Sequence, residues 1–331
     1  MDFRGQNILI TGGSGAIGSQ LVRRLLKDGP AQLLVIDDLS SGYAWLLPQD
    51  PRVVLRQLDV CRIGEIDIER PVVFHLAAFF ANQNSVDHPL DDLRTNGIGT
   101  LTTLVMAQRA GAKRVVYASA GCSIAGHGID APVREDMPVS LDLDTPYQIT
   151  KALGEFYCNY FKDLVSTVRC RFFNSYGPGE VPGRYRNVIP NFIWRALHDE
   201  PLIITGTGEE TRDFIYVDDL VDGLVRSAIT PAAHGGAFNL GTGIQTRVID
   251  LARMIISQCR SRSRIEYAPR RAWDHSTRRH ADVGRARSIL GFEPGVCLEE
   301  GISRTIAWFR EHFDRIAESV GSEPVQVTQR Q

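Results

Sequence analysis

A glycine-rich turn near the start of the chain sets the strongest limit on its fold. The motif TGGSGAIG joins the apolar run Asn7–Thr11 to the amphipathic segment Ile17–Asp28. Gly12 allows a tight turn, Gly15 lets the backbone approach a pyrophosphate, and Gly18 lets the helix pack closely on the strand. The N-terminus of that helix offers free N–H groups to phosphates. The turn therefore predicts a strand–turn–helix unit that binds a dinucleotide.

Strand-like and helix-like segments alternate through the first half of the chain. Helical patterns follow the first helix at about 91–110 and at Tyr147–Phe161. The expected strands are continuous apolar runs, at Asn7–Thr11, Gln32–Asp37, Val53–Leu58, Val72–Leu76, Arg114–Ala118 and Thr167–Phe173. Such runs, separated by helices, are typical of a parallel sheet covered on both faces. We expect a Rossmann-type doubly wound α/β fold.

After Phe173 the segments become shorter and richer in Pro, Gly and Arg. This change is expected of a smaller C-terminal α/β lobe that closes over a substrate. We expect a dinucleotide-binding domain at 1–173 with a return at about 212–242, and a substrate-binding lobe at 174–211 and 243–315. Residues 316–331 lack apolar periodicity, so we expect them to form a flexible tail.

Composition narrows the set of partners. The chain has 331 residues, and its net charge of −2 gives no reason to expect nucleic acid or an anionic membrane as partner. The six cysteines are scattered and lack metal-site spacing, so we expect reduced thiols and no bound metal. A strand begins almost at the first residue, leaving no room for a signal peptide, and no apolar run approaches the length of a membrane span. We expect a cytoplasmic protein.

A carboxylate at the end of the second strand indicates which dinucleotide binds. Asp37 is placed to accept hydrogen bonds from both hydroxyls of the adenosine ribose, and it would repel a 2′-phosphate. We therefore expect NAD rather than NADP. Asp38 follows as a second acid, for which a solvated turn residue is the alternative. Asp59 and Val60, at the end of the third strand, are candidates for the edge of the adenine.

Tyr147 and Lys151 form a candidate catalytic pair. They are four residues apart, so they share one face of the expected helix. A free tyrosine has a pKa of about 10, which is too high for a base at neutral pH. A lysine ammonium one turn away and a positively charged nicotinamide both favour the phenolate. The pair therefore predicts proton transfer at a site beside the cofactor.

Further motifs follow in order along the chain. They are VIDDLSSG (35–42), HLAA (75–78), NGIGTLTTL (96–104), YQITK (147–151), RFFNSYGPG (171–179), TRDFIYVDD (211–219), FNLGTG (238–243) and RRAWD (270–274). With TGGSGAIG they resemble the extended short-chain dehydrogenases/reductases, in the NAD-dependent nucleotide-sugar epimerase/dehydratase branch, over about Asn7 to Phe309. The chain is most similar there to the UDP-hexose 4-epimerases. The resemblance implies a nucleotide-diphosphate sugar as substrate and a homodimer formed through a four-helix bundle.

The resemblance also implies residue roles. Besides Tyr147 and Lys151, the residues expected to bind NAD are Gly12, Gly15, Ala16, Ile17, Gly18, Asp37, Asp38, Asp59, Val60, Leu76, Ala77, Ala78, Asn96 and Ser119. The residues expected to bind the nucleotide sugar are Asn174, Val188, Phe192, Arg212, Arg271 and Asp274. Two guanidiniums match a diphosphate, and a carboxylate accepts hydrogen bonds from vicinal hydroxyls, which agrees with the last three roles.

The loop after the fifth strand discriminates between reactions. Aligned on Gly126, the position of the family's catalytic Ser or Thr is Gly121, and the next two are Cys122 and Ser123. Sugar dehydratases carry an Asp-Glu pair there and decarboxylases a glutamate, so we expect a 4-epimerase. Ser123 is the expected substitute hydroxyl, ahead of Ser119 and Cys122. A dehydratase or reductase, or a catalytically silent NAD-binding protein, is the alternative.

Two further stretches bear on the sugar. Arg278 and Arg279 lie near the position that faces the sugar in UDP-hexose epimerases, with a spacing one residue longer. An arginine there either binds a uronic acid carboxylate or is a surface charge. Phe79–Ser85 reads FFANQNS and is expected to supply polar side chains to the pocket wall. These residues do not name the sugar or the nucleotide.

Overall fold

A central parallel sheet organises the chain. The computed structural model describes residues 2–121, 126 and 130–321. The sheet has seven strands in the order β11-β6-β5-β4-β1-β2-β3. Their bounds are β1 Asn7–Thr11, β2 Gln32–Asp37, β3 Val53–Gln57, β4 Val72–His75, β5 Arg114–Ala120, β6 Thr167–Phe172 and β11 Ala237–Leu240. All neighbouring pairs are parallel, so the predicted doubly wound fold is confirmed.

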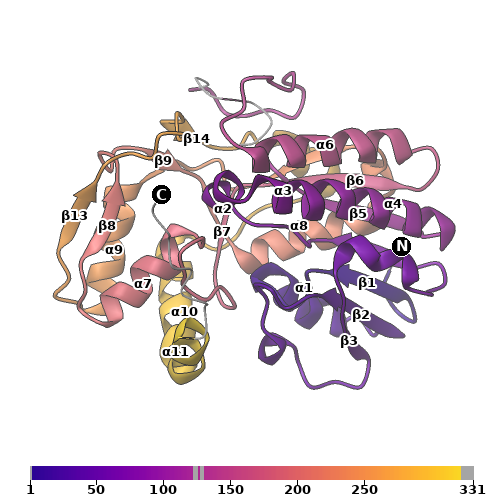
Figure 1. The fold of residues 1–331 in the computed structure, drawn as a ribbon, viewed down its shortest axis with the longest axis horizontal. Coiled ribbons are helices and arrows are strands. Elements are labelled where there is room, and N and C mark those ends of the chain that lie inside the picture. The colour runs from indigo at the N-terminus through magenta and orange to yellow at the C-terminus, as the bar shows by residue number, and fades with distance from the viewer. Residues whose placement is uncertain (1, 122–125, 127–129, 322–331) are drawn as a thin grey trace.

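Helices cover both faces of the sheet. On one face lie α1 (Ala16–Leu26) and α8 (Val217–Ile229), and on the other lie α4 (Gly99–Arg109) and α6 (Pro146–Phe161) (Figure 1). Successive strand residues point to opposite faces. Ile8 and Ile10 accordingly belong to the apolar core under the first pair of helices, whereas Leu9 belongs to the core under the second pair. This burial on both faces explains why the strands read as continuous apolar runs.

Short helical segments connect these elements. Between the sheet strands lie η1 Ala44–Leu46, η2 Val60–Glu65, α2 Asn82–Asp87, α3 Pro89–Asp92 and η4 Pro231–Ala233. A π-helical turn, η3 (Leu93–Ile98), joins α3 to α4. Helix α6 begins at Pro146 after Thr145, whose side chain accepts a hydrogen bond from Gln148 N. A Thr cap followed by Pro in the first turn is a strong start signal, and it fixes where α6 begins.

The second lobe has its own core. It contains the helices α7 Val188–Leu197, α9 Val248–Cys259, α10 Leu298–Glu311 and α11 Phe313–Gly321, with the π-helical turn η5 Ala286–Leu290 lying against α8. Its strands pair as β8 Leu202–Thr205 with β13 Ile265–Ala268, β7 Asn174–Tyr176 with β10 Phe214–Tyr216, and β12 Thr246–Arg247 with β9 Thr211–Arg212 and β14 Arg278–Arg279. Apart from η5, β7 and β10, these elements lie toward one end of the molecule (Figure 1).

The predicted flexible tail is wrong for residues 316–321. Helix α11 runs to Gly321, and Ile316 is fully buried in the core of the second lobe. The segment is amphipathic over fewer than three turns, which is too short for its periodicity to stand out in the sequence. Residues 322–331 lie outside the described part of the chain. Among the described residues, no helix is long and apolar enough to cross a membrane.

A buried ion pair fastens α6 to the sheet. Glu155 on α6 accepts bonds from Arg171 Nε (2.9 Å) and Nη2 (2.9 Å) on β6, and from Ser119 Oγ (2.7 Å) on β5. Both charged side chains are at most 5% exposed. Removing one partner of such a pair leaves an uncompensated charge in a low-dielectric interior. The pair therefore holds the helix in register with two strands.

We predict that Glu155→Gln lowers the free energy of unfolding by about 3–5 kcal/mol, because Arg171 keeps its charge and loses its partner. The measurement is denaturant unfolding followed by circular dichroism. Glu65→Gln is the matched control, since Glu65 pairs with Arg62 at the surface, where both side chains are more than half exposed. An equal effect of both substitutions would contradict the prediction.

Candidate functional site

A cavity of about 520 Å³ lies at the carboxyl ends of the sheet strands. This edge, where the strand order reverses between β1 and β4, is where doubly wound folds bind ligands. Its lining includes every residue expected to bind NAD except Asn96: Gly12, Gly15, Ala16, Ile17, Gly18, Asp37, Asp38, Asp59, Val60, Leu76, Ala77, Ala78, Ser119, Tyr147 and Lys151. Asn174 from the substrate set also lines the cavity.

At two positions of the glycine turn, Gly12 and Gly18, the neighbouring backbone leaves no room for a side chain. Gly12 has φ +69°, and a Cβ there would lie 2.7 Å from Ala77 N. A Cβ on Gly18 would lie 2.3 Å from Gly12 O. Helix α1 begins at Ala16, so its first N–H groups face the same cavity. These residues fit a bound dinucleotide.

Asp37 is the acid at the ribose position. Its carboxylate is 8% exposed and accepts bonds from Ser14 N (2.9 Å) and Leu39 N (2.9 Å). Burial raises the pKa of Asp37, and the two backbone bonds oppose that increase. Asp38 is exposed and accepts from Ser40 N and Oγ, which is the geometry of a turn residue. Asp37 is therefore the better placed of the two acids.

The remaining NAD-side residues depend on a second layer of polar contacts. Thr11 Oγ1 accepts a bond from Ala77 N (3.2 Å), which positions the HLAA loop. Asp59 caps η2 through Cys61 N and pairs with Arg94 at 2.6 Å. Asn96 is buried behind the cavity wall, where its Oδ1 accepts from Phe79 N at 2.8 Å. Asn96 therefore supports the wall and does not line it.

Tyr147 and Lys151 lie together in the cavity wall. They are 9% and 3% exposed, and Lys151 Nζ is 5.6 Å from the centre of the Tyr147 ring. Lys151 Nζ donates a 2.9 Å bond to Ala118 O at the end of β5. Burial lowers the pKa of Lys151 to about 8. The ammonium is thus still the main form at neutral pH, beside the phenol whose ionised form it stabilises.

Of the candidates for the missing hydroxyl, Ser119 lies within the described part of the chain. Ser119 Oγ donates to Glu155 at 2.7 Å, so its hydroxyl proton is already used behind the wall. Ser123 and Cys122 lie outside the described residues. A Cβ at Gly121 would lie 2.3 Å from the ring of Phe173. A side chain at position 121 therefore needs Phe173 to move.

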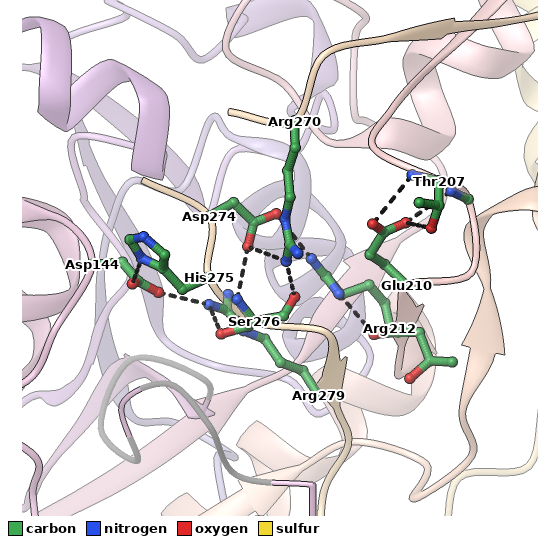
Figure 2. A network of polar contacts seen from close by, with 11 residues as sticks. Asp144, Thr207, Glu210, Arg212, Arg270, Asp274, His275, Ser276 and Arg279 are labelled. Atoms are coloured by element: carbon green, nitrogen blue, oxygen red, sulfur yellow. Dashed lines mark hydrogen bonds and ion pairs between the residues drawn. The ribbon is translucent and has the colours of Figure 1, made fainter. Parts of the chain in front are cut away.

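Three of the expected substrate residues, Arg212, Arg271 and Asp274, lie in the second lobe. Arg212 on β9 forms an ion pair with Asp274 at 3.3 Å, and Arg270 approaches the same carboxylate at 3.9 Å (Figure 2). Arg271 is exposed, and its guanidinium lies 5.7 Å from the centre of the Trp273 ring. Two positive groups and a carboxylate are thus assembled, outside the lining of the cavity described above.

Helix α7 contributes less directly than expected. Val188 is the first residue of α7 and is half-buried. Phe192, one turn later, is buried in the core of the second lobe and does not line the cavity. Its burial follows from its position on the inner face of an amphipathic helix, together with Ile189 and Ile193.

Arg279 is not a surface charge, because its side chain is buried and bonded within the protein. It is 8% exposed and donates to Asp144 (3.2 Å) and to Ser276 Oγ (2.5 Å), whereas Arg278 is exposed (Figure 2). His275 also contacts Asp144, at 2.7 Å between Nδ1 and Oδ1. Asp144 lies three residues before Tyr147. The segment that carries Arg271 and Asp274 is therefore bonded to the start of the catalytic helix.

The polar stretch Phe79–Ser85 divides between structure and cavity. Asn82 and Asn84 line the cavity. Gln83 accepts a 2.8 Å bond from Trp273 Nε1 and thereby joins α2 to the second lobe. Ser85 is buried, and its Oγ accepts from Tyr147 N at 3.0 Å.

Sequence reasoning did not predict three polar residues of the cavity wall, which are Glu180, Arg186 and Asn187. Glu180 is 6% exposed, burial raises its pKa to about 7, and its Oε1 accepts a 2.8 Å bond from Asn187 Nδ2. Arg186 donates a bond to the backbone oxygen of Ser41, and both residues line the cavity. All three lie in the irregular segment between β7 and α7. The signals in the sequence were the position of Glu180 directly after the recognised YGPG motif and the polar run GRYRN (183–187), which contains Arg186 and Asn187.

Comparison with known proteins agrees with this geometry. The NAD dependent epimerase/dehydratase family matches residues 8–241. A UDP-glucose 4-epimerase of Mycolicibacterium smegmatis is 36% identical over 312 residues, which cover 91% of this chain and 98% of that protein. UDP-glucuronic acid decarboxylase 1 of Danio rerio is 33% identical over 322 residues, covering 94% of this chain and 74% of that protein.

Solved structures give the same result. The epimerase Mth375 of Methanothermobacter thermautotrophicus has a TM-score of 0.92 and 43% identity, with 96% of each chain covered. The enzyme WbmF of Bordetella bronchiseptica, in complex with NAD+ and UDP, has a TM-score of 0.82 and 34% identity, covering 96% of this chain and 95% of that one. The fold, the cavity and these similarities together lead to one conclusion: the chain is an enzyme of the NAD-dependent epimerase/dehydratase family, and its cofactor is NAD.

Proposed function

We propose that the chain is a nucleotide-sugar 4-epimerase and that its substrate is a UDP-sugar. The proposal is carried by the buried Tyr147–Lys151 pair, together with the sequence at positions 119–125, which contains no acidic residue. Similarity to a UDP-glucose 4-epimerase supports it, and so does similarity to a structure solved with UDP. The chain is almost as similar in sequence to a decarboxylase, so the choice of reaction has to be argued from the residues of the site.

The proposed reaction needs one base and one cation from the chain. When bound, NAD supplies a reversible acceptor for a hydride from C4 of the sugar. Tyr147, as phenolate, takes the proton from the sugar O4 hydroxyl as that hydride leaves, which gives a 4-keto sugar. The keto sugar presents its other face, and Tyr147 returns the proton to O4 as the hydride returns to C4. Lys151 lowers the cost of the phenolate through its positive charge.

Dehydration and decarboxylation need more than this pair. Dehydration across C5–C6 requires an acid and a base, and decarboxylases of the family carry a glutamate in the loop after β5. Gly121, Cys122 and Ser123 supply neither. Inversion at C4 needs only the tyrosine, the lysine and a hydroxyl, for which Ser123 is the proposed donor.

Glu180 favours one competing function, a sugar dehydratase. Its carboxyl lines the cavity, and burial raises its pKa to about 7, the range suited to acid or base work at neutral pH. It comes from the segment after β7 and so from a different position than the family's acidic pair. A loss of water from the sugar product would identify this function.

The nucleotide end has a proposed site in the second lobe. A diphosphate would compete with Asp274 for the guanidinium of Arg212, and Arg271 is exposed to join it. The carboxylate released from Arg212 would then be free to accept bonds from ribose hydroxyls.

The reaction is tested with a panel of UDP-, dTDP-, GDP- and CDP-sugars in deuterated water, whose products are separated by chromatography and identified by mass spectrometry and proton NMR. We expect an isomer of a UDP-sugar without deuterium at C5. Deuterium at C5 with loss of water indicates the dehydratase, and loss of carbon dioxide from a uronic acid indicates a decarboxylase. No turnover of any member would contradict both enzymatic proposals.

We predict that Tyr147→Phe slows epimerisation by about 10²–10⁴-fold, because the phenyl ring cannot accept the O4 proton. The measurement is the initial rate at saturating UDP-sugar with NAD occupancy matched between variants. Tyr157→Phe, on the same helix and outside the cavity lining, is the control and should keep the parent rate. Equal rates for the parent and Tyr147→Phe would exclude the assigned role.

We also propose a homodimer formed through α4 and α6. Apolar side chains on these helices are unusually exposed: Val105 (50%) on α4, and Ile149 (55%), Phe156 (57%) and Tyr160 (70%) on α6. The α6 residues are spaced by seven and four positions, so they lie on one face of the helix. An apolar face of this kind on two adjacent helices fits a four-helix bundle with a second copy.

Phe156→Glu is expected to convert the dimer to a monomer, because a charge would be buried in the apolar interface. The measurement is molar mass by light scattering after size exclusion. Tyr267→Glu is the matched control, since Tyr267 is 58% exposed on β13 in the other lobe. A parent chain that elutes as a monomer at micromolar concentration would refute the proposal.

A further inference from the structure

Asp92 is a buried carboxylate with no role in the site described so far. It is the last residue of α3 and is fully buried. Its Oδ2 accepts a 2.7 Å bond from Thr150 Oγ1, and its Oδ1 accepts a 2.7 Å bond from Asn96 Nδ2. Thr150 immediately precedes Lys151 on α6. A carboxylate held in the interior by two short bonds, one of them from the residue that precedes a buried lysine, calls for a physical reason.

The π-helical turn explains how Asp92 reaches this position. Leu93–Ile98 forms that turn, and Asn96 within it bonds both to Asp92 and to the backbone of Phe79. Single π turns inside helices are frequent at functional sites. Here the turn brings the end of α3 and the Asn96 amide to the same side of α6.

Lys151 is the group that gains from a nearby anion. It is 3% exposed, and its Nζ donates a 2.9 Å bond to the neutral carbonyl of Ala118. Burial lowers the pKa of Lys151 to about 8, and the attraction of Asp92 opposes that decrease. Burial also raises the pKa of Asp92 to about 6, so Asp92 is ionised at neutral pH.

Other titratable groups around Lys151 are uncharged at neutral pH. Burial, and then repulsion by Lys151, lower the pKa of His75 on β4 to about 3. Burial raises the pKa of Tyr117 on β5 well above its ordinary value. The same cause raises the pKa of the Cys158 thiol on α6. None of the three can balance the ammonium.

Two further groups, Tyr147 and Glu155, lie one turn from Lys151 on α6 itself. Glu155 forms a buried ion pair with Arg171 at 2.9 Å, so its charge is already matched by a cation. Tyr147 is the group whose ionisation the lysine has to support. Of these neighbours, Asp92 alone offers Lys151 a standing negative charge.

We propose that Asp92 is a positioning residue: its buried carboxylate keeps the ammonium of Lys151 charged and so acts on Tyr147 through Lys151. This inference rests on the proposed function, in which the ammonium supports the phenolate. Thr150 and Asn96 fix the carboxylate at its place, and neither it nor they touch the sugar.

The test is a direct titration of Lys151 in the full-length chain saturated with NAD. The chain has only four lysines, so lysine labelled with ¹³C at Cε gives few resonances, and Lys151→Arg assigns the one of interest. In Asp92→Asn we expect the midpoint of Lys151 to fall by about one pH unit, the effect of losing one nearby opposite charge. Asp92→Glu keeps the charge and should return the midpoint toward that of the parent.

The pH dependence of kcat should shift in the same direction as the Lys151 midpoint. Because the ammonium is lost at lower pH in Asp92→Asn, the alkaline limb of the kcat profile moves to lower pH together with the Lys151 midpoint. Asp67→Asn is the matched control, since it removes the same charge from an exposed side chain outside the cavity lining, and it should leave the Lys151 midpoint in place.

An unchanged Lys151 midpoint in folded Asp92→Asn would overturn the inference, and so would a lower rate or stability without a shift in pH. If Asp92→Asn does not fold, Thr150→Val removes one bond to the carboxylate and should lower the midpoint by a smaller amount; no change there overturns the proposal as well. A shifted midpoint without turnover of any nucleotide sugar supports the role of Asp92 and refutes the epimerase.

Discussion

The site depends on keeping one ammonium charged inside the protein. Removing a cation from water is expensive, and an unsupported lysine in the interior loses its proton instead. Lys151 is buried beside the end of β5, where its Nζ donates a bond to Ala118 O. The same Nζ lies over the ring of Tyr147. The position of α6 against β5 is therefore a chemical requirement as well as a matter of packing.

Several distant parts of the chain serve that requirement. The Thr145 cap sets where α6 begins, which decides that Tyr147 and Lys151 face the cavity. The Glu155–Arg171 pair holds the next turn of the helix against β5 and β6. Both lie one step back from the reacting atoms. A change in either would displace the catalytic pair without removing it.

The sheet and the NAD side were predictable because their signals are local. Continuous apolar runs, a glycine turn and an acid at the end of β2 each occupy a few neighbouring residues, and these gave the strand positions and the place of Asp37. The turn Gly12–Gly18 and the catalytic spacing of Tyr147 and Lys151 needed no knowledge of distant contacts.

What the sequence could not show depends on long-range packing. Asp92 reads as an ordinary polar residue before a helix, and only the π-helical turn carries it inward to Thr150. Glu180 lies in an irregular segment where no periodicity distinguishes inside from outside. Arg278 and Arg279 are adjacent and chemically identical, and which one is buried depends on the register of β14 against β9.

The bonds from Asp144 to His275 and Arg279 have a consequence for how binding energy is used. They connect the segment with Arg271 and Asp274 to a residue only one turn ahead of Tyr147. A shift of this segment therefore reaches the start of α6 through a short, partly buried linkage. Under the proposed function, binding free energy from the nucleoside would help to align the reacting hydroxyl of the sugar. A sugar phosphate without the nucleoside would therefore lose turnover as well as affinity.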